Sequence, residues 1–155
     1  MGKLSRVRHL KDLISHENLE LVGVQETIKK QFSERELISL SPDVNFQWNY
    51  IPAKGHSGGI LVGVRNNILE VERWDKGEFF VEAQVRNRLT NFRWSVIVVY
   101  GPANHDFSAA FLEELGKKCT ESLLPVLIGG DFNLIRSDED RSSGQGGQSA
   151  DGCLQ

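Results

Sequence analysis

Two carboxylates in this sequence directly follow short apolar segments. Glu26 comes after the run at residues 21–24, and Asp131 comes after the run at residues 126–128 and two glycines. A carboxylate at the end of a buried strand is uncommon unless it is paired or bound to a metal. If the two strands are neighbours, two hard oxygen ligands meet at one edge. That donor set suits Mg²⁺ or Mn²⁺ together with waters and a phosphate oxygen, whereas Zn²⁺ favours His or Cys.

The second of these carboxylates lies in the segment PVLIGGDFN, residues 125–133. Its apolar run is typical of a strand buried on both faces, and the glycine pair lets the backbone turn or approach a ligand. If the chain stays extended, Asp131 and Asn133 face the same way and could hold a metal or a phosphate. An Asx-rich turn that closes a core strand explains the same residues.

Three further groups could contact a phosphate. His56 and Ser57 precede two glycines, and such a loop could offer backbone N–H groups and a hydroxyl. A Gly-rich hairpin loop is the alternative. Tyr100 ends an apolar segment where its hydroxyl could reach a cleft; a half-buried tyrosine at the rim is the alternative. For Glu26, the alternative role is a carboxylate at a helix N-terminus.

The spacing of apolar residues predicts the elements that position these groups. Residues 4–14 have helical spacing, and Ser33 with Glu36 forms a capping box for a short helix that Pro42 stops. From residue 44 to residue 100 the period changes to two, with polar turns, which indicates an antiparallel meander. Asp106 or Ser108 could cap a last helix. The predicted strands outside the meander are residues 19–24 and 126–128.

The length of 155 residues fits one domain, and the order of elements predicts an α+β fold with helices outside one or two sheets. The net charge of −3 argues against a strongly basic nucleic-acid binder but allows an enzyme that reaches phosphates through a metal. No segment suits a membrane span or a secretory signal, so we expect an intracellular protein, nuclear or cytoplasmic and not secreted. Cys119 and Cys153 are expected to be free thiols. Residues 142–155 are expected to be a disordered, Gly/Ser-rich tail.

Four motifs, LVGVQET, HSGGI, VYGP and LIGGDFN, stand in an order that resembles the endonuclease/exonuclease/phosphatase superfamily. The sequence is most similar to the endonuclease domain of plant LINE-type (non-LTR) retrotransposons, because an Arg-Ser-acidic-Arg segment follows at residues 135–141. The resemblance implies a domain over residues 1–141 with an incomplete four-layer α/β sandwich, two mostly antiparallel sheets with outer helices. It also implies Mg²⁺-dependent cleavage of phosphodiester bonds in DNA.

The resemblance assigns roles to individual residues. Glu26 takes the place of the metal ligand, and Asp131 takes the place of the group that orients the attacking water. Asn133 would hold the scissile phosphate, and Tyr100 would stabilise the developing charge. The remaining two residues, His56 and Ser57, would lie on the phosphate-binding side.

The sequence also departs from the family pattern. It shows neither the Asn-bearing first strand nor the C-terminal Asp-His pair, and Ala103 stands where the family has Asn, with Asn104 one position late. We therefore expect a truncated domain with weak or no activity, because general acid–base catalysis contributes about 10²–10⁴ in rate. The alternatives are a non-enzymatic remnant or binding module, and a phosphatase of the same superfamily that acts on inositol or lipid phosphates.

Overall fold

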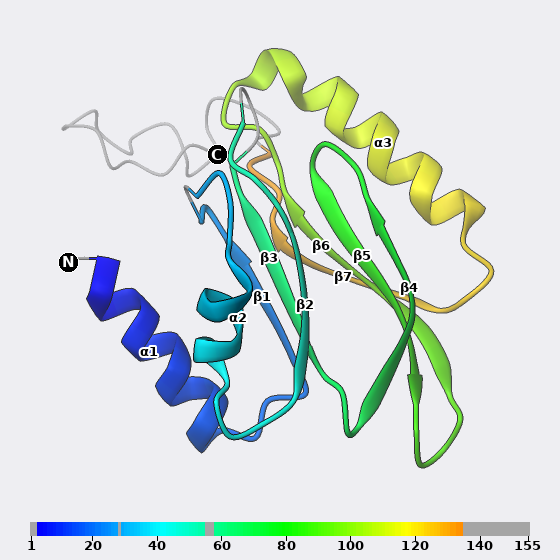
Figure 1. Ribbon diagram of the computed structural model, residues 1–155. Coiled ribbons are helices and arrows are strands. Elements are labelled where there is room, and N and C mark those ends of the chain that lie inside the picture. Colours follow the sequence, from blue (N-terminus) through cyan, green and yellow to red (C-terminus); the bar gives the residue numbers. More distant parts are fainter. Residues whose placement is uncertain (1–2, 28, 55–57, 135–155) are drawn as a thin grey trace, which may run out of the picture.

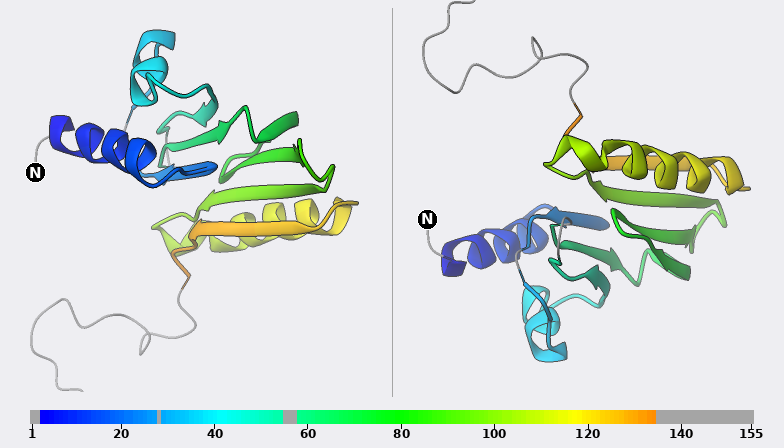
Figure 2. Two further views of the ribbon diagram at one scale, coloured as in Figure 1. Left: turned by 90° about the horizontal axis from the view of Figure 1, so that it is seen from below. Right: turned by 90° about the horizontal axis from the view of Figure 1, so that it is seen from above.

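The computed structural model describes residues 3–27, 29–54 and 58–134 (Figure 1). Two β-sheets pack face to face; helices α1 and α2 lie outside one sheet and helix α3 lies outside the other (Figure 2). This confirms the predicted α+β architecture with outer helices. In chain order the elements are α1 (Lys3–His16), β1 (Leu21–Gln25), α2 (Glu34–Leu40), β2 (Phe46–Ile51), β3 (Ile60–Arg65), β4 (Leu69–Lys76), β5 (Phe80–Asn87), β6 (Arg93–Tyr100), the 3₁₀ helix η1 (His105–Phe107), α3 (Ser108–Glu121) and β7 (Val126–Asp131).

The strands divide into a three-stranded sheet, ordered β1-β3-β2, and a four-stranded sheet, ordered β4-β5-β6-β7. All neighbours are antiparallel except β6 and β7, which are parallel. The prediction of one meander over residues 44–100 was wrong in one respect. Strand β3 pairs with β1 and β2, so the turn after Arg65 carries the chain to the other sheet and β4 does not return along β3. Period-two spacing identifies the faces of a strand but not its partner.

Three apolar clusters hold the layers together. The largest lies between the sheets and includes Ile60, Val62 and Val64 of β3, a strand that is buried on both faces. A second cluster packs α3 against the four-stranded sheet through Phe79 and Phe111. The third packs α1 and α2 onto the outer face of the three-stranded sheet through Ile14 and Leu40. Each sheet is therefore covered on both faces, which fixes the ends of the strands relative to one another.

Strand β7 differs from its prediction. It lies at the edge of its sheet, and Leu127 is 57% exposed, whereas a strand buried on both faces was expected. Only alternate residues, Val126 and Ile128, pack toward α3. A short apolar run is common to central strands and to half-covered edge strands, and its length does not separate the two.

The helix termini test the capping predictions. The capping box of α2 is confirmed, because Ser33 Oγ accepts from the Glu36 backbone N–H at 3.2 Å and the Glu36 side chain accepts from the Ser33 N–H. The predicted cap of α3 by Asp106 or Ser108 was wrong: α3 begins at Ser108 after Phe107, without a side-chain cap. Asn104 instead caps η1 through the Asp106 N–H.

No helix among the described residues is long and apolar enough to cross a membrane. Cys119 is a free thiol, half-buried on α3. Cys153, the 135–141 segment and the predicted disordered tail at residues 142–155 lie outside the described residues, as do His56 and Ser57.

Candidate active site at the strand ends

Side chains from both sheets meet at one end of the sandwich. Strands β6 and β7 are parallel, and Tyr100 on β6 lies beside Asp131 on β7. Glu26 follows β1, which faces β7 across the sandwich rather than beside it in one sheet (Figure 1). The carboxyl ends of β1, β6 and β7 therefore point the same way. We refer to Glu26, Tyr100, Asp131 and Asn133 as the strand-end cluster.

Asp131 and Asn133 are fixed by a turn and not by an extended strand. Asn133 has a φ of 49°, and its backbone N–H donates to Asp131 Oδ1 at 3.0 Å. Its side-chain Nδ2 donates to the Gly101 carbonyl at 2.8 Å, and the Gly101 N–H donates to the Asp131 carbonyl at 2.8 Å. The Asx turn and the ligand site were alternative interpretations of Asp131 and Asn133, but a turn can also position both side chains at a ligand site. The chain is not extended at Asn133, so the condition for the two side chains to face the same way is not met and the alternative, an Asx turn, is present.

The backbone before Asp131 depends on one of its two glycines. Gly130 has a φ of +132°, and a Cβ there would lie 2.1 Å from the Val99 carbonyl oxygen and 2.9 Å from Gln25 Nε2. A Cβ on Gly129 would meet nothing within 4 Å. Only glycine fits the second position, because its backbone adopts positive φ without a steric clash. This close approach brings β7 against the end of β1.

Glu26 also has a left-handed backbone, with a φ of 56°. The next residue, Thr27, donates its N–H to the Gly59 carbonyl at 3.3 Å, so the end of β1 is tied to the start of β3. Non-glycine residues with positive φ are uncommon and occur often at functional sites. Two of the four such residues in the described part of the chain, Glu26 and Asn133, lie in the strand-end cluster.

The pKa of the Tyr100 hydroxyl depends on its burial and on the charges of the cluster. Burial raises the pKa of its hydroxyl above 10.0, the negative charges of Glu26 and Asp131 raise that pKa further, and a hydrogen bond with Asn133 opposes the rise. The side chain is half-buried, and its ring lies where a Cβ on Gly58 would come within 2.1 Å of Cε1. Tyr100 is therefore a neutral hydrogen-bond donor across the physiological pH range. The cluster is a single electrostatic unit built from both sheets.

Neither carboxylate of the cluster forms an ion pair with any residue that the structure describes. Both side chains are exposed. Within the same described residues, no group of three or more His, Cys, Asp and Glu side chains converges as a metal site. Two carboxylates and open space fit a hard divalent cation that keeps waters and takes a phosphate oxygen, and they do not fit zinc.

The predicted phosphate-binding residues, His56 and Ser57, lie outside the described residues, and their role stays a prediction. The glycines that follow them are placed at the cluster: Gly58 lies against Tyr100, and Gly59 accepts from Thr27. Asn104, considered above as a displaced family residue, instead serves as a cap. Tyr100 therefore lies at the site, while Asn104 has a structural role.

Two residues at this site were not selected from the sequence. Gln25 approaches Gly130 of the opposite sheet, and the buried Thr27 Oγ1 has no hydrogen-bond partner within the described parts of the chain. Buried polar atoms are nearly always satisfied, so an unpaired hydroxyl beside Glu26 is notable. Both residues flank Glu26 in the triplet Gln-Glu-Thr. This adjacency to a candidate metal ligand could have identified them from the sequence.

Comparison with known proteins identifies the family of the chain. The model of the endonuclease/exonuclease/phosphatase family matches residues 2–153. The chain belongs to this family. Among curated proteins, no sequence matches it.

Several solved structures share the fold of this family member. The human Nocturnin catalytic domain with bound sulfate superposes with a TM-score of 0.62 at 12% identity, covering 85% of this chain and 58% of that one. D. rerio TDP2 complexed with a single-strand DNA product gives 0.65 at 15% identity, covering 87% and 56%. A mannosyl-6-phosphatase of Bacteroides thetaiotaomicron gives 0.58 at 13% identity, covering 85% and 58%. The chain thus spans less than two thirds of each of these structures.

Proposed function

We propose that this chain is a divalent-metal-dependent phosphodiesterase that cleaves DNA at the strand-end cluster, with Mg²⁺ or Mn²⁺ as the cation. One arrangement carries the proposal: Asp131 lies beside Tyr100 in the β6–β7 register, and Gln25, the residue before Glu26, approaches Gly130 of the opposite sheet. Within the described residues neither Glu26 nor Asp131 is paired with a cationic side chain. Members of this family are generally dependent on divalent metals.

Each residue has a role that its position supports. Glu26 would hold the cation, which supplies Lewis-acid neutralisation of a phosphoryl oxygen when it is bound. Tyr100, neutral at physiological pH, donates a hydrogen bond toward the charge that builds on the phosphate. Asn133 is held by Gly101 and offers its amide to the same group. Asp131 accepts a hydrogen bond from the attacking water and orients it.

We propose that turnover by this chain is slow. Among the described residues of the strand-end cluster there is no histidine, the most frequent general base in enzymes. General acid–base catalysis contributes about 10²–10⁴ in rate. Slow cleavage that depends on both carboxylates is therefore the expected behaviour.

Two sequence features favour a LINE-type ancestry, namely the segment at residues 135–141 and the order of the four motifs. That ancestry favours DNA over a phosphate monoester as the substrate. The TDP2 structure holds a single-strand DNA product, and the Bacteroides protein is a mannosyl-6-phosphatase. Both share the fold, which therefore does not select between the substrates. The substrate has to be tested directly.

The test is nicking of supercoiled plasmid with Mg²⁺ or Mn²⁺ by the wild type, Glu26→Gln and Asp131→Asn. Glu20→Gln, an exposed carboxylate before the other end of β1, is the matched control. We expect slow nicking that both cluster substitutions abolish and the control keeps. Phosphate release from inositol phosphates without nicking would show a phosphatase instead. No turnover and no metal binding by calorimetry would show a non-enzymatic module.

A further inference from the structure

We propose that a groove along helix α1 binds the single-stranded nucleic-acid segment that flanks the scissile phosphate. The inference rests on the proposed phosphodiesterase function and names the part of the substrate that lies outside the strand-end cluster. Three features carry it: Glu26 is part of the wall, the α1 side of the rim is cationic while Lys29 on the other side pairs with Glu36, and the floor is apolar and includes an aromatic ring. We call this surface the α1 groove.

The α1 groove consists of two adjoining cavities. The first, of about 450 Å³, lies between α1 and the residues that end β1, and Glu26 is part of its wall. The second, of about 540 Å³, continues between α1 and α2. Val7, Lys29, Phe32 and Leu40 line both. The shared lining residues make the two cavities adjacent, so a chain that leaves the strand-end cluster at Glu26 can continue along α1.

The rim concentrates positive charge in a protein whose net charge is −3. Among its described side chains, helix α1 carries one carboxylate, Asp12, against three cations that line the two cavities, namely Arg6, Arg8 and Lys11. Arg6 and Arg8 are exposed, line the two cavities, and form no ion pair with any described residue. Net charge alone argued against nucleic-acid binding, but its distribution places a cationic helix beside the candidate site.

The floor of the groove is suited to flat apolar groups. Phe32 lies edge-on to Tyr50 with ring centroids 4.9 Å apart, and Lys29 Nζ lies 5.1 Å from the Phe32 centroid. Val7 and Leu13 are 39% and 37% exposed, although both are apolar. Single-stranded nucleic acid presents this pairing of chemistries, since bases stack on aromatic rings while phosphates contact cations. Continuity with Glu26 favours it over other amphiphilic anions.

The test measures binding of fluorescein-labelled (dT)12 to the full chain by anisotropy, in EDTA, so that no cleavage is required. Arg6→Glu/Arg8→Glu is compared with Arg73→Glu/Lys117→Glu, which changes net charge equally at exposed positions on β4 and α3. We expect the α1 variant to bind about tenfold more weakly and to reduce the slope of log K against log salt by about 1.4, for two lost phosphate contacts. The control should bind as the wild type. Equal loss in both variants, or no binding by the wild type, would overturn the proposal.

The floor is tested with Phe32→Leu, which keeps an apolar side chain and removes the ring. We expect several-fold weaker binding of (dT)12 and unchanged binding of an abasic oligonucleotide of the same length, with unchanged circular dichroism. Equal effects on both ligands would overturn a base-binding floor. Phosphatidylserine vesicles that bind in an α1-dependent way while (dT)12 does not would assign the groove to lipid.

The two proposals fail separately. Binding of (dT)12 in EDTA that depends on α1, without any nicking in Mg²⁺, would refute the proposed activity and leave the groove. Nicking that depends on Glu26 but is unchanged in Arg6→Glu/Arg8→Glu, together with unchanged binding, would refute the groove and leave the activity.

Discussion

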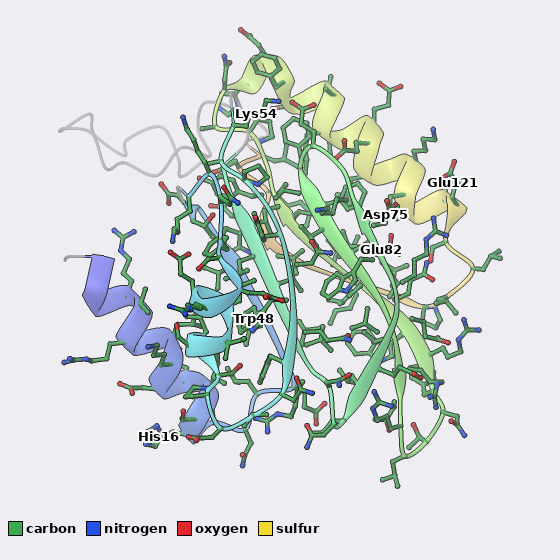
Figure 3. All side chains as sticks on the ribbon, in the orientation of Figure 1. His16, Trp48, Lys54, Asp75, Glu82 and Glu121 are labelled. Atoms are coloured by element: carbon green, nitrogen blue, oxygen red, sulfur yellow. The ribbon has the colours of Figure 1, made fainter. Side chains whose placement is uncertain are left out.

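Two regions of this molecule each contain a pair of carboxylates, and the chain surrounds the two pairs in opposite ways. Under helix α3, Asp75 on β4 lies directly opposite Glu82 on β5 (Figure 3). Lys118 of α3 contacts both carboxylates, and Ser95 donates to Glu82 at 2.7 Å. We refer to these four residues as the α3 cluster. Glu82 is only 1% exposed, so its charge is neutralised inside the fold.

The strand-end cluster has the same two charges without a cation. Glu26 and Asp131 are exposed, and among the described residues neither forms an ion pair. The difference separates the structural role of the α3 cluster from the cation binding proposed for the strand-end cluster. Carboxylates that the chain neutralises with its own lysine hold a helix on a sheet, whereas carboxylates left uncompensated on the surface are available to an external cation.

The largest expected effect comes from replacing one glutamate of each cluster with glutamine. Glu26→Gln should lower plasmid nicking by about 10²-fold or more, while the free energy of unfolding stays within about 0.5 kcal/mol, because the side chain is exposed and unpaired. Glu82→Gln should do the reverse, lowering stability by about 1–3 kcal/mol with unchanged nicking per folded molecule. Urea denaturation and nicking rates on the same preparations decide it. Equal loss of stability in both variants would remove the distinction.

Removal of the lysine tests the α3 cluster alone. Lys118→Met leaves Glu82 buried and Asp75 without its partner, so the free energy of unfolding should fall by about 3–5 kcal/mol. Lys117→Met, the exposed neighbour on α3, is the control and should change stability by less than about 0.5 kcal/mol. Adding Glu82→Gln to Lys118→Met should recover part of the loss. An unchanged midpoint in Lys118→Met would mean that the buried pair contributes nothing.

The two glycines before Asp131 test how the backbone positions the strand-end cluster. Gly130→Ala should destabilise the protein by about 1–3 kcal/mol and reduce nicking further than the unfolded fraction explains, because Asp131 follows directly. Gly129→Ala, with open space around its Cβ, should change neither quantity appreciably. Both are measured by thermal denaturation and nicking. If the two variants behave alike, the close approach of β7 to β6 does not position the cluster.

The smallest effect is a shift in titration. The protein has two tyrosines, so the absorbance change at high pH of the wild type minus that of Tyr100→Phe isolates Tyr100. Its midpoint should lie above 10.0, chiefly from burial, and Glu26→Gln should lower it while Glu82→Gln leaves it unchanged. Because the pKa is raised on folding, this stabilisation is complete below pH 10 and is lost as the pH rises through the folded value. A midpoint insensitive to Glu26→Gln would separate Glu26 from the cluster.

The elements and the fold class could be predicted from the sequence to a large extent. The capping box at Ser33 and the helical spacing of residues 4–14 depend on neighbours within a few positions, and both agree with the structure. The candidate residues Glu26, Tyr100 and Asp131 were found because each follows an apolar run, and the structure brings them together. Glu82 was not predicted as a site of interest, although it is a carboxylate within a buried apolar strand. Its role depends on Lys118, which is distant in sequence and lies on a helix.

The local periods and the turns could be predicted from the residue order because each depends on adjacent residues, and the family motifs could be recognised in that order as well. The division of the chain between two sheets, and the edge position of β7 with Leu127 exposed, follow from tertiary packing. Tertiary packing also decided which carboxylates receive a cation from the chain. Charge compensation depends on side chains that come together from distant positions in the chain. The periodicity of apolar residues and the composition do not identify those partners.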